Sequence, residues 1–162
     1  MSELDYQSTP ASTAPPTNQQ SQLDASLLEA VQVQTTKLEG RQRQISATLK
    51  LPYSVEQIWQ VLTDYESLAE FIPNLAKSQR LEHPEGRIRL EQIGMQKALK
   101  FNFSARVVLD MTEEFPQAIR FQMVEGDFKD FSGAWELEPL PDPSGPFTLL
   151  SYTVRVWSKL TV

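Results

Sequence analysis

The sequence predicts an α+β protein in which a curved, seven-stranded antiparallel sheet carries two short helices between its first and second strands. Apolar and polar residues alternate along several segments, most clearly over 100–111, with the period of a half-buried strand. Capping-box spacing from Ser54 to Gln57 and from Thr63 to Glu66 indicates two helix starts soon after the first strand. The connections between the expected strands are short, so neighbouring strands should run antiparallel.

The first strand and the two helices come first in the expected domain. The strand is expected over 41–51, where alternate residues are apolar, and Pro52 ends it. A helix over 55–62 follows the first capping box. A second short helix runs through Phe71, and Pro73 closes it because proline cannot continue a helix.

Six further strands are expected after the helices. The phase of the alternation shifts at Ile93-Gly94, which indicates a bulge or bend. A proline-rich stretch over 139–146 is expected to form an exposed loop before the last strand. The six expected strands lie over 76–82, 87–95, 100–111, 118–124, 131–139 and 147–157.

Residues 1–36 differ in composition from the rest and are expected to form a disordered, acidic and proline-rich tail. The chain has 162 residues and a net charge of −6, and residues 1–30 hold four carboxylates with no Lys or Arg. Such a segment cannot bury enough apolar surface to offset the entropy lost on ordering. The folded domain is therefore expected over 37–162.

Composition removes several classes of function. The chain has no Cys and a single His, His83, in an expected surface turn. It therefore offers no thiolate and no general base beside a nucleophile. The carboxylates Glu113, Glu114, Asp127 and Asp130 fall in expected turns, where solvation explains them. We expect no catalytic residue, no metal and no cofactor. The negative net charge and the lack of a basic stripe argue against nucleic-acid binding.

One face of the expected sheet is apolar and larger than the helices can cover. Seven strands make a face of roughly 680 Å². Two helices of this length cover only roughly 240 Å². We expect the uncovered face to form a cavity for an apolar molecule. Its candidate lining residues are Trp59, Phe71, Gln92, Phe101, Phe103, Val107, Phe121, Met123, Trp135, Tyr152 and Val154.

The order of elements resembles the START-like helix-grip superfamily (SRPBCC), and its polyketide cyclase/dehydrase and coenzyme Q-binding branch in particular. Residues 58–65 (IWQVLTDY), 68–75 (LAEFIPNL) and 126–133 (GDFKDFSG) carry the resemblance, which spans about 37–157. The resemblance implies a long C-terminal helix across the sheet, but the sequence stops at Val162. We expect this helix to be absent, through C-terminal truncation or because a partner or a second copy supplies it.

The resemblance and the apolar face together predict non-enzymatic binding or transport of a hydrophobic small molecule of lipid, isoprenoid or quinone type. Two alternatives stay open. One is a cyclase or dehydrase acting on an apolar substrate, and the other is a protein-interaction module that uses the open sheet face. We expect a cytoplasmic protein, membrane-peripheral through transient membrane contact.

Overall fold

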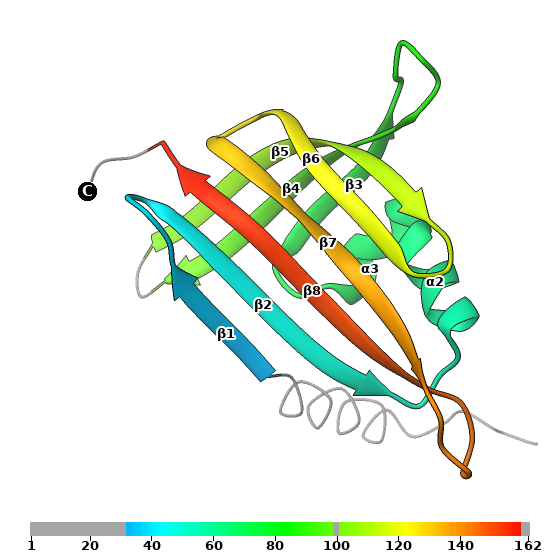
Figure 1. The fold of residues 1–162 in the computed structure, drawn as a ribbon. Coiled ribbons are helices and arrows are strands. Elements are labelled where there is room, and N and C mark those ends of the chain that lie inside the picture. The colour runs from blue at the N-terminus through cyan, green and yellow to red at the C-terminus, as the bar shows by residue number, and fades with distance from the viewer. Residues whose placement is uncertain (1–31, 99–100, 160–162) are drawn as a thin grey trace, which may run out of the picture. The chain divides into compact units, whose positions relative to one another are not determined.

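The computed structural model describes residues 32–98 and 101–159, and these form one antiparallel sheet with short helical segments after its second strand (Figure 1). The eight strands have the order β1-β2-β8-β7-β6-β5-β4-β3. The elements are β1 (Gln32–Lys37), β2 (Gln42–Leu51), α2 (Val55–Thr63), η1 (Tyr65–Ser67), α3 (Leu68–Phe71), β3 (Leu75–Leu81), β4 (Ile88–Ala98), β5 (Phe101–Glu114), β6 (Ala118–Gly126), β7 (Phe128–Leu140) and β8 (Phe147–Ser158). The expected α+β fold class is confirmed.

The sheet has eight strands rather than the expected seven, because β1 adds an edge strand beside β2. All six residues of β1 are exposed, so the strand shows none of the alternation that marks a half-buried strand. Five of the six residues of β1, 32–36, were expected to belong to the tail. The rest of the expected tail, residues 1–31, lies outside the described residues.

The first expected helix start is confirmed, and the second differs. The Ser54 hydroxyl accepts a hydrogen bond from the Gln57 backbone N–H at 3.2 Å, and the Gln57 side chain accepts one from the Ser54 backbone N–H at 2.9 Å. Thr63 caps nothing: it still belongs to α2, and its hydroxyl donates to the Trp59 carbonyl at 2.8 Å. Asp64 takes the cap position of η1 without a side-chain cap bond.

Irregular pairing bends the sheet. The bulge expected at Ile93-Gly94 lies on the opposite strand, where the register between β3 and β4 shifts between Leu75 and Lys77. A second shift lies between β5 and β6, near Gly126. At Gly126, whose φ is +156°, a Cβ would lie 2.6 Å from the Arg106 carbonyl oxygen, so only glycine fits this close approach.

The helices cover one end of the apolar face. Buried residues of α2, including Ile58 and Leu62, share a core with buried residues of the central strands, such as Leu109 and Ile119. At the same end, the Trp59 ring meets the ring of Phe115 in the β5–β6 turn at 5.1 Å. The opposite end, where β1 turns into β2 and β6 turns into β7, lies away from the helices (Figure 1).

Candidate functional site

Four aromatic rings lie in series on the same sheet face as the helices, and we call them the aromatic shelf: Phe121, Phe131, Trp135 and Tyr152. The ring centroids of Trp135 and Tyr152 are 4.4 Å apart, those of Phe121 and Tyr152 are 5.8 Å apart, and those of Phe121 and Phe131 are 5.8 Å apart. Phe128 extends the series, 5.6 Å from Phe131. Strands β6, β7 and β8 therefore present one nearly continuous aromatic surface.

Gly133 makes this arrangement possible. It pairs with Phe121 across β6 and β7 and with Val154 across β7 and β8. A Cβ at Gly133 would lie 2.8 Å from Phe121 Cζ and 2.9 Å from Val154 Cα, and it would also strike the Thr153 carbonyl oxygen. The Phe121 ring thus occupies the space that any larger residue in place of Gly133 would need.

The aromatic shelf is only partly sealed by the described residues. Phe121 is 5% exposed and belongs to the buried core. Phe131, Trp135 and Tyr152 are half-buried and pack against the edge of that core, as does Phe128. The end of the face beneath α2 is therefore closed core, and the aromatic end keeps apolar area that a further apolar group can cover.

Tyr152 supplies a polar group within this apolar surface. Burial raises the pKa of its hydroxyl to about 12, because the surroundings disfavour the charged phenolate. The hydroxyl makes no hydrogen bond to another described residue. At neutral pH it is therefore protonated and available to donate a hydrogen bond to a molecule on the shelf.

Gln92 is the other polar group expected on this face, and it already has a partner. Its side-chain amide donates to the hydroxyl of buried Ser78 at 3.2 Å, between β4 and β3. This pairing satisfies Ser78, which would otherwise be a buried unpaired hydroxyl. Gln92 thus has a structural role at the β3–β4 side of the sheet.

The structure places the expected lining residues in three different environments. Trp59, Val107, Phe121 and Val154 are buried in the core, and Met123, Trp135 and Tyr152 are packed against it. Phe71 is 62% exposed and outside the core cluster, because it ends the four-residue helix α3, so its expected place in the cavity is not supported. Phe101 and Phe103 belong to β5, and their side chains lie outside the described part of the structure.

The sequence did not predict the hydrogen bond between buried Tyr65 and exposed Glu113. The Tyr65 hydroxyl donates to Glu113 Oε1 at 2.7 Å, and burial and the carboxylate together raise the pKa of Tyr65 far above its usual range. Glu113 was expected to be a solvated turn residue; it is exposed as expected, but it lies near the end of β5, in phase with Leu109 and Met111. This shared phase with Leu109 and Met111 was the sequence pattern that could have placed Glu113 on the helix-covered face of β5. The pair fastens η1 to the sheet.

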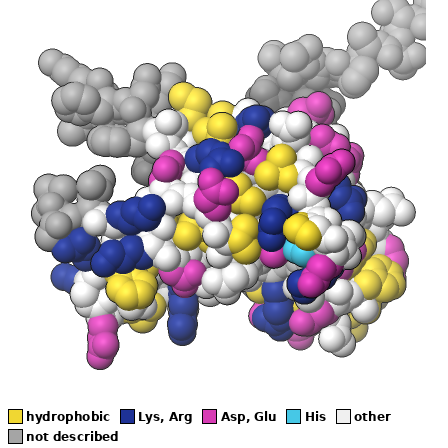
Figure 2. Space-filling model, turned by 90° about the horizontal axis from the view of Figure 1, so that it is seen from above, with side chains coloured by type: hydrophobic (Ala, Val, Ile, Leu, Met, Phe, Trp, Pro, Cys, Tyr) yellow, Lys and Arg dark blue, Asp and Glu magenta, His cyan; other side chains and the backbone are white. Residues whose placement is uncertain are grey.

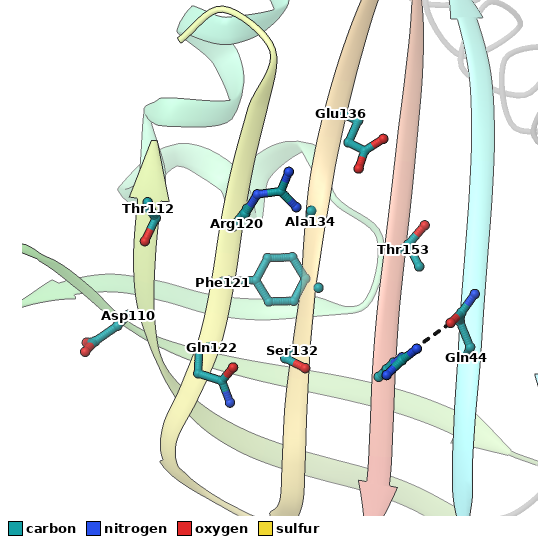
Figure 3. A pocket seen from close by; sticks show the side chains of 12 residues that line it. Gln44, Asp110, Thr112, Arg120, Phe121, Gln122, Ser132, Ala134, Glu136 and Thr153 are labelled. Carbon is teal, nitrogen blue, oxygen red and sulfur yellow. Dashed lines mark hydrogen bonds between the residues drawn. The ribbon is translucent and has the colours of Figure 1, made fainter. Parts of the chain in front are cut away.

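The outer face of the sheet carries a polar hollow of about 470 Å³ (Figure 3). Small residues of β7, Ser132 and Ala134, form its floor, and longer polar side chains of the neighbouring strands rise around it. At its β2–β8 side, the Arg155 side chain donates to the Gln44 side-chain oxygen at 3.5 Å. Because the lining is charged and polar, this hollow does not suit the apolar molecule expected on the other face.

His83 is also on the outer face and is less exposed than expected. Its side chain is 5% exposed, with Nε2 3.4 Å from an Asp110 oxygen, and its Nδ1 accepts the Glu85 backbone N–H at 2.9 Å. Asp110 in turn accepts two hydrogen bonds from Arg89, at 2.7 and 3.1 Å, which hold the pKa of Asp110 below its usual range. These contacts close the β3–β4 turn onto β5.

The described residues contain neither a metal-binding cluster nor a membrane-spanning helix. No group of three or more His, Cys, Asp or Glu side chains in residues 32–98 and 101–159 is placed to hold a metal ion. Within the same ranges, no helix has both the length and the apolar character needed to cross a bilayer.

A curved antiparallel sheet with short helices after an early strand and an aromatic surface on its inner face defines a helix-grip protein. Residues 51–162 match the family described as polyketide cyclase/dehydrase and lipid transport. The chain belongs to this family, which confirms the resemblance seen in the sequence.

Among curated proteins, the chain is similar to the ribosome association toxin RatA of Escherichia coli K12, with 32% identity over 97 residues. The match covers 60% of this chain and 59% of RatA, so the chain spans about three fifths of the length of that relative.

Two solved structures share the fold. A STAR-related lipid transfer protein from Xanthomonas axonopodis has a TM-score of 0.59 and 17% identity, and the match covers 83% of this chain and 80% of that one. The Zhui aromatase/cyclase from Streptomyces sp. R1128 has a TM-score of 0.58 and 18% identity, with 75% and 71% covered. At this identity the likeness shows the fold alone.

Proposed function

We propose that this protein binds one hydrophobic small molecule of lipid, isoprenoid or quinone type on the aromatic shelf and carries it without transforming it. The observation that supports this most directly is the half-buried state of Phe131, Trp135 and Tyr152. A flat or chain-like apolar molecule laid on these rings removes their remaining area from water, which is worth about 25 cal/mol per Å² of apolar surface. The hydroxyl of Tyr152 orients one polar atom of the molecule.

The non-enzymatic part of the proposal rests on the ionisable groups that face the shelf. A general acid or base works best when its pKa lies near the working pH. Tyr152 has a pKa of about 12, so it neither gives up nor accepts a proton readily at neutral pH. Glu113 is occupied by the Tyr65 hydroxyl at the helix-covered end. These groups favour a carrier over the cyclase or dehydrase alternative.

The test is binding of parinaric acid, an apolar fluorescent fatty acid, followed by energy transfer from tryptophan. We expect saturable binding with one molecule per chain. Trp135→Ala should weaken binding roughly two- to tenfold, since one aromatic contact is worth about 0.5–1.5 kcal/mol. Trp157→Ala is the matched control, because Trp157 is 40% exposed and alternates to the outer face of β8. Equal affinity in wild type and Trp135→Ala, or an equal loss in both variants, would refute the shelf as the site.

A second candidate function is association with the ribosome, and the observation that favours it is the 32% identity to RatA. That protein is named for ribosome association, and the open sheet face gives this chain a surface for a macromolecular partner. Sedimentation of a cell lysate through a sucrose gradient distinguishes the two candidate functions. A chain that binds parinaric acid and stays at the top of the gradient is a carrier alone, whereas co-migration with ribosomal particles at physiological salt supports this second role.

A further inference from the structure

We infer that a cluster of unpaired basic side chains at the open end of the sheet docks the protein onto an anionic membrane surface. We call this cluster the basic corner. It is built from the end of β1, the start of β2, the start of β7 and the end of β8, and it comprises Lys37, Arg41, Arg43, Lys129, Arg155 and Lys159. Figure 2 shows Lys and Arg side chains gathered at the left of the molecule, the side on which β8 ends in Figure 1.

Contacts across the four strands place these residues together. Lys37 and Arg43 are directly opposite each other in the β1–β2 register. The Arg41 guanidinium donates to the Lys159 carbonyl at 3.3 Å. Lys129 Nζ lies 5.1 Å from the ring centroid of Trp157 in β8. The corner is therefore the rim of the sheet at these strand ends, with Lys37 and Arg43 on the face of the shelf and Lys129 and Arg155 on the outer face.

The positive charge of the corner is not neutralised by ion pairs. None of its six side chains forms a salt bridge with a carboxylate of the described residues, and the hydrogen bonds that they make go to neutral oxygens, such as those of Gly126, Gly40 and Gln44. Elsewhere the basic side chains are mostly paired with acids, as in Lys50, Lys77, Arg87, Arg89, Arg106 and Arg120. The chain as a whole has a net charge of −6, so this unneutralised positive cluster is the surface that attracts an anionic partner.

Carboxylates near the corner are fewer than its bases. Glu39 lies in the β1–β2 turn, Glu125 lies near the end of β6 and pairs with Arg106, Asp127 lies in the β6–β7 turn, and Asp130 lies near the start of β7. Asp127 accepts the Arg106 backbone N–H at 2.7 Å, and Asp130 accepts the Gln122 side chain at 3.1 Å. These hydrogen bonds hold Asp127 against β5 and Asp130 against β6. The corner therefore keeps an excess of positive charge.

On the inner face the corner continues into the aromatic shelf through Arg43, and this continuity supports a membrane as the partner. Arg43 pairs with Val156, and Val156 pairs with Phe131 of the shelf. On the outer face of the same rim, Trp157 adds a 40% exposed indole beside Lys129. Basic side chains beside half-buried apolar rings and an exposed indole match the charged headgroups and the boundary of a bilayer. Proteins that bind single-stranded nucleic acid stack bases on free rings, and Lys129 already covers the exposed indole of Trp157.

The test is co-sedimentation of the purified protein with vesicles, without any added apolar ligand, so that docking is read separately from the proposed carrier function. Vesicles of phosphatidylcholine with phosphatidylglycerol should bind the protein, and pure phosphatidylcholine should not. Binding should fall steeply at 0.5 M salt, an ionic strength at which charges are screened within about 5 Å. Each basic residue near an anionic surface contributes roughly fivefold to partitioning.

Matched charge reversals locate the effect. Lys37→Glu with Lys129→Glu and Lys159→Glu changes three exposed bases of the corner and should weaken partitioning at least about a hundredfold. The control reverses the same number of exposed bases elsewhere, at Lys50, Arg87 and Arg120. It should retain most of the binding. A second corner triple with Gln in place of Glu, checked by thermal unfolding, excludes misfolding as the cause.

Three outcomes would overturn the inference. The first is no binding of the wild type to anionic vesicles at low salt. The second is an equal loss in the corner and control triples, which would mean that net charge alone decides. The third is displacement from vesicles by poly(U) RNA together with tighter binding of that RNA, which would identify the corner as a nucleic-acid surface. Loss of parinaric acid binding with vesicle binding intact would instead refute only the carrier proposal.

Discussion

Replacing Gly133 with alanine tests the packing on which the aromatic shelf depends. The new methyl group would meet Phe121 Cζ at 2.8 Å and Val154 Cα at 2.9 Å, and it would strike the Thr153 carbonyl oxygen. Two of these three neighbours are backbone atoms in a paired strand, which cannot rotate away. Overpacking of a core usually costs about 1–3 kcal/mol. Because two of the three neighbours are backbone atoms, we expect Gly133→Ala to lower the free energy of unfolding by an amount at the upper end of this range, about 3 kcal/mol.

Gly94→Ala is the matched control, since a Cβ at Gly94 meets only the Asn74 carbonyl oxygen, at the ordinary contact distance of 3.8 Å. Alanine is better than glycine inside a strand by about 0.5–1 kcal/mol, so this variant should be as stable as the wild type or slightly more stable. Urea unfolding followed by tryptophan fluorescence measures both variants. With an m-value of about 2 kcal/mol/M, the midpoint of Gly133→Ala should fall by about 1.5 M. A wild-type midpoint for Gly133→Ala, or an equal fall for Gly94→Ala, would refute the packing described at Phe121.

Three further predictions concern ionisable groups. Tyr65→Phe removes the hydrogen bond to Glu113 and should lower the free energy of unfolding by about 1.5–3 kcal/mol, measured by urea unfolding at pH 7; an unchanged value would mean that the pair contributes nothing. Ultraviolet titration should show one phenol with a midpoint near pH 12 that is absent in Tyr152→Phe, and stability should fall as pH rises from about 10 through 12, because the folded pKa is raised. The pKa of Asp110 is lowered by Arg89, so its contribution to stability is present above its unfolded pKa of about 3.9 and is lost as pH falls through the lower folded value. Asp110→Asn should therefore be less stable than the wild type at pH 7, and urea unfolding at a series of lower pH values should show this difference shrinking below about pH 3.9.

The strands and helices were predictable where one face is buried. The alternation over 100–111 led to β5, and the Ser54–Gln57 capping box led to the start of α2, because both patterns are local and tied to burial. Strand β1 was not predictable from alternation, since its residues are exposed on both faces of an edge strand. Thr63 fits the capping pattern equally well, but its hydroxyl bonds within α2 instead.

Within the candidate site, the pairing of Trp135 with Tyr152 was predictable from the sequence, and the contact between Tyr65 and Glu113 was not. Phase along β7 and β8 indicates that Trp135 and Tyr152 share a face, and their register pairs them directly. The hydrogen bond between Tyr65 and Glu113 joins residues 48 positions apart in the sequence, so no local sequence pattern predicts it. The exposure of Phe71 follows from the shortness of α3, whose four residues give no helical period from which to assign a face.

The most direct measurement is the mass of the purified protein under native conditions, compared with its mass after extraction with organic solvent. A protein that carries a hydrophobic molecule on Phe131, Trp135 and Tyr152 should weigh more than its polypeptide by one apolar compound, and the solvent extract should contain that compound. The fraction of the protein that carries this extra mass should be smaller in Trp135→Ala and unchanged in Trp157→Ala. A folded wild-type protein with the bare polypeptide mass, and no apolar compound in the extract, would contradict the carrier function.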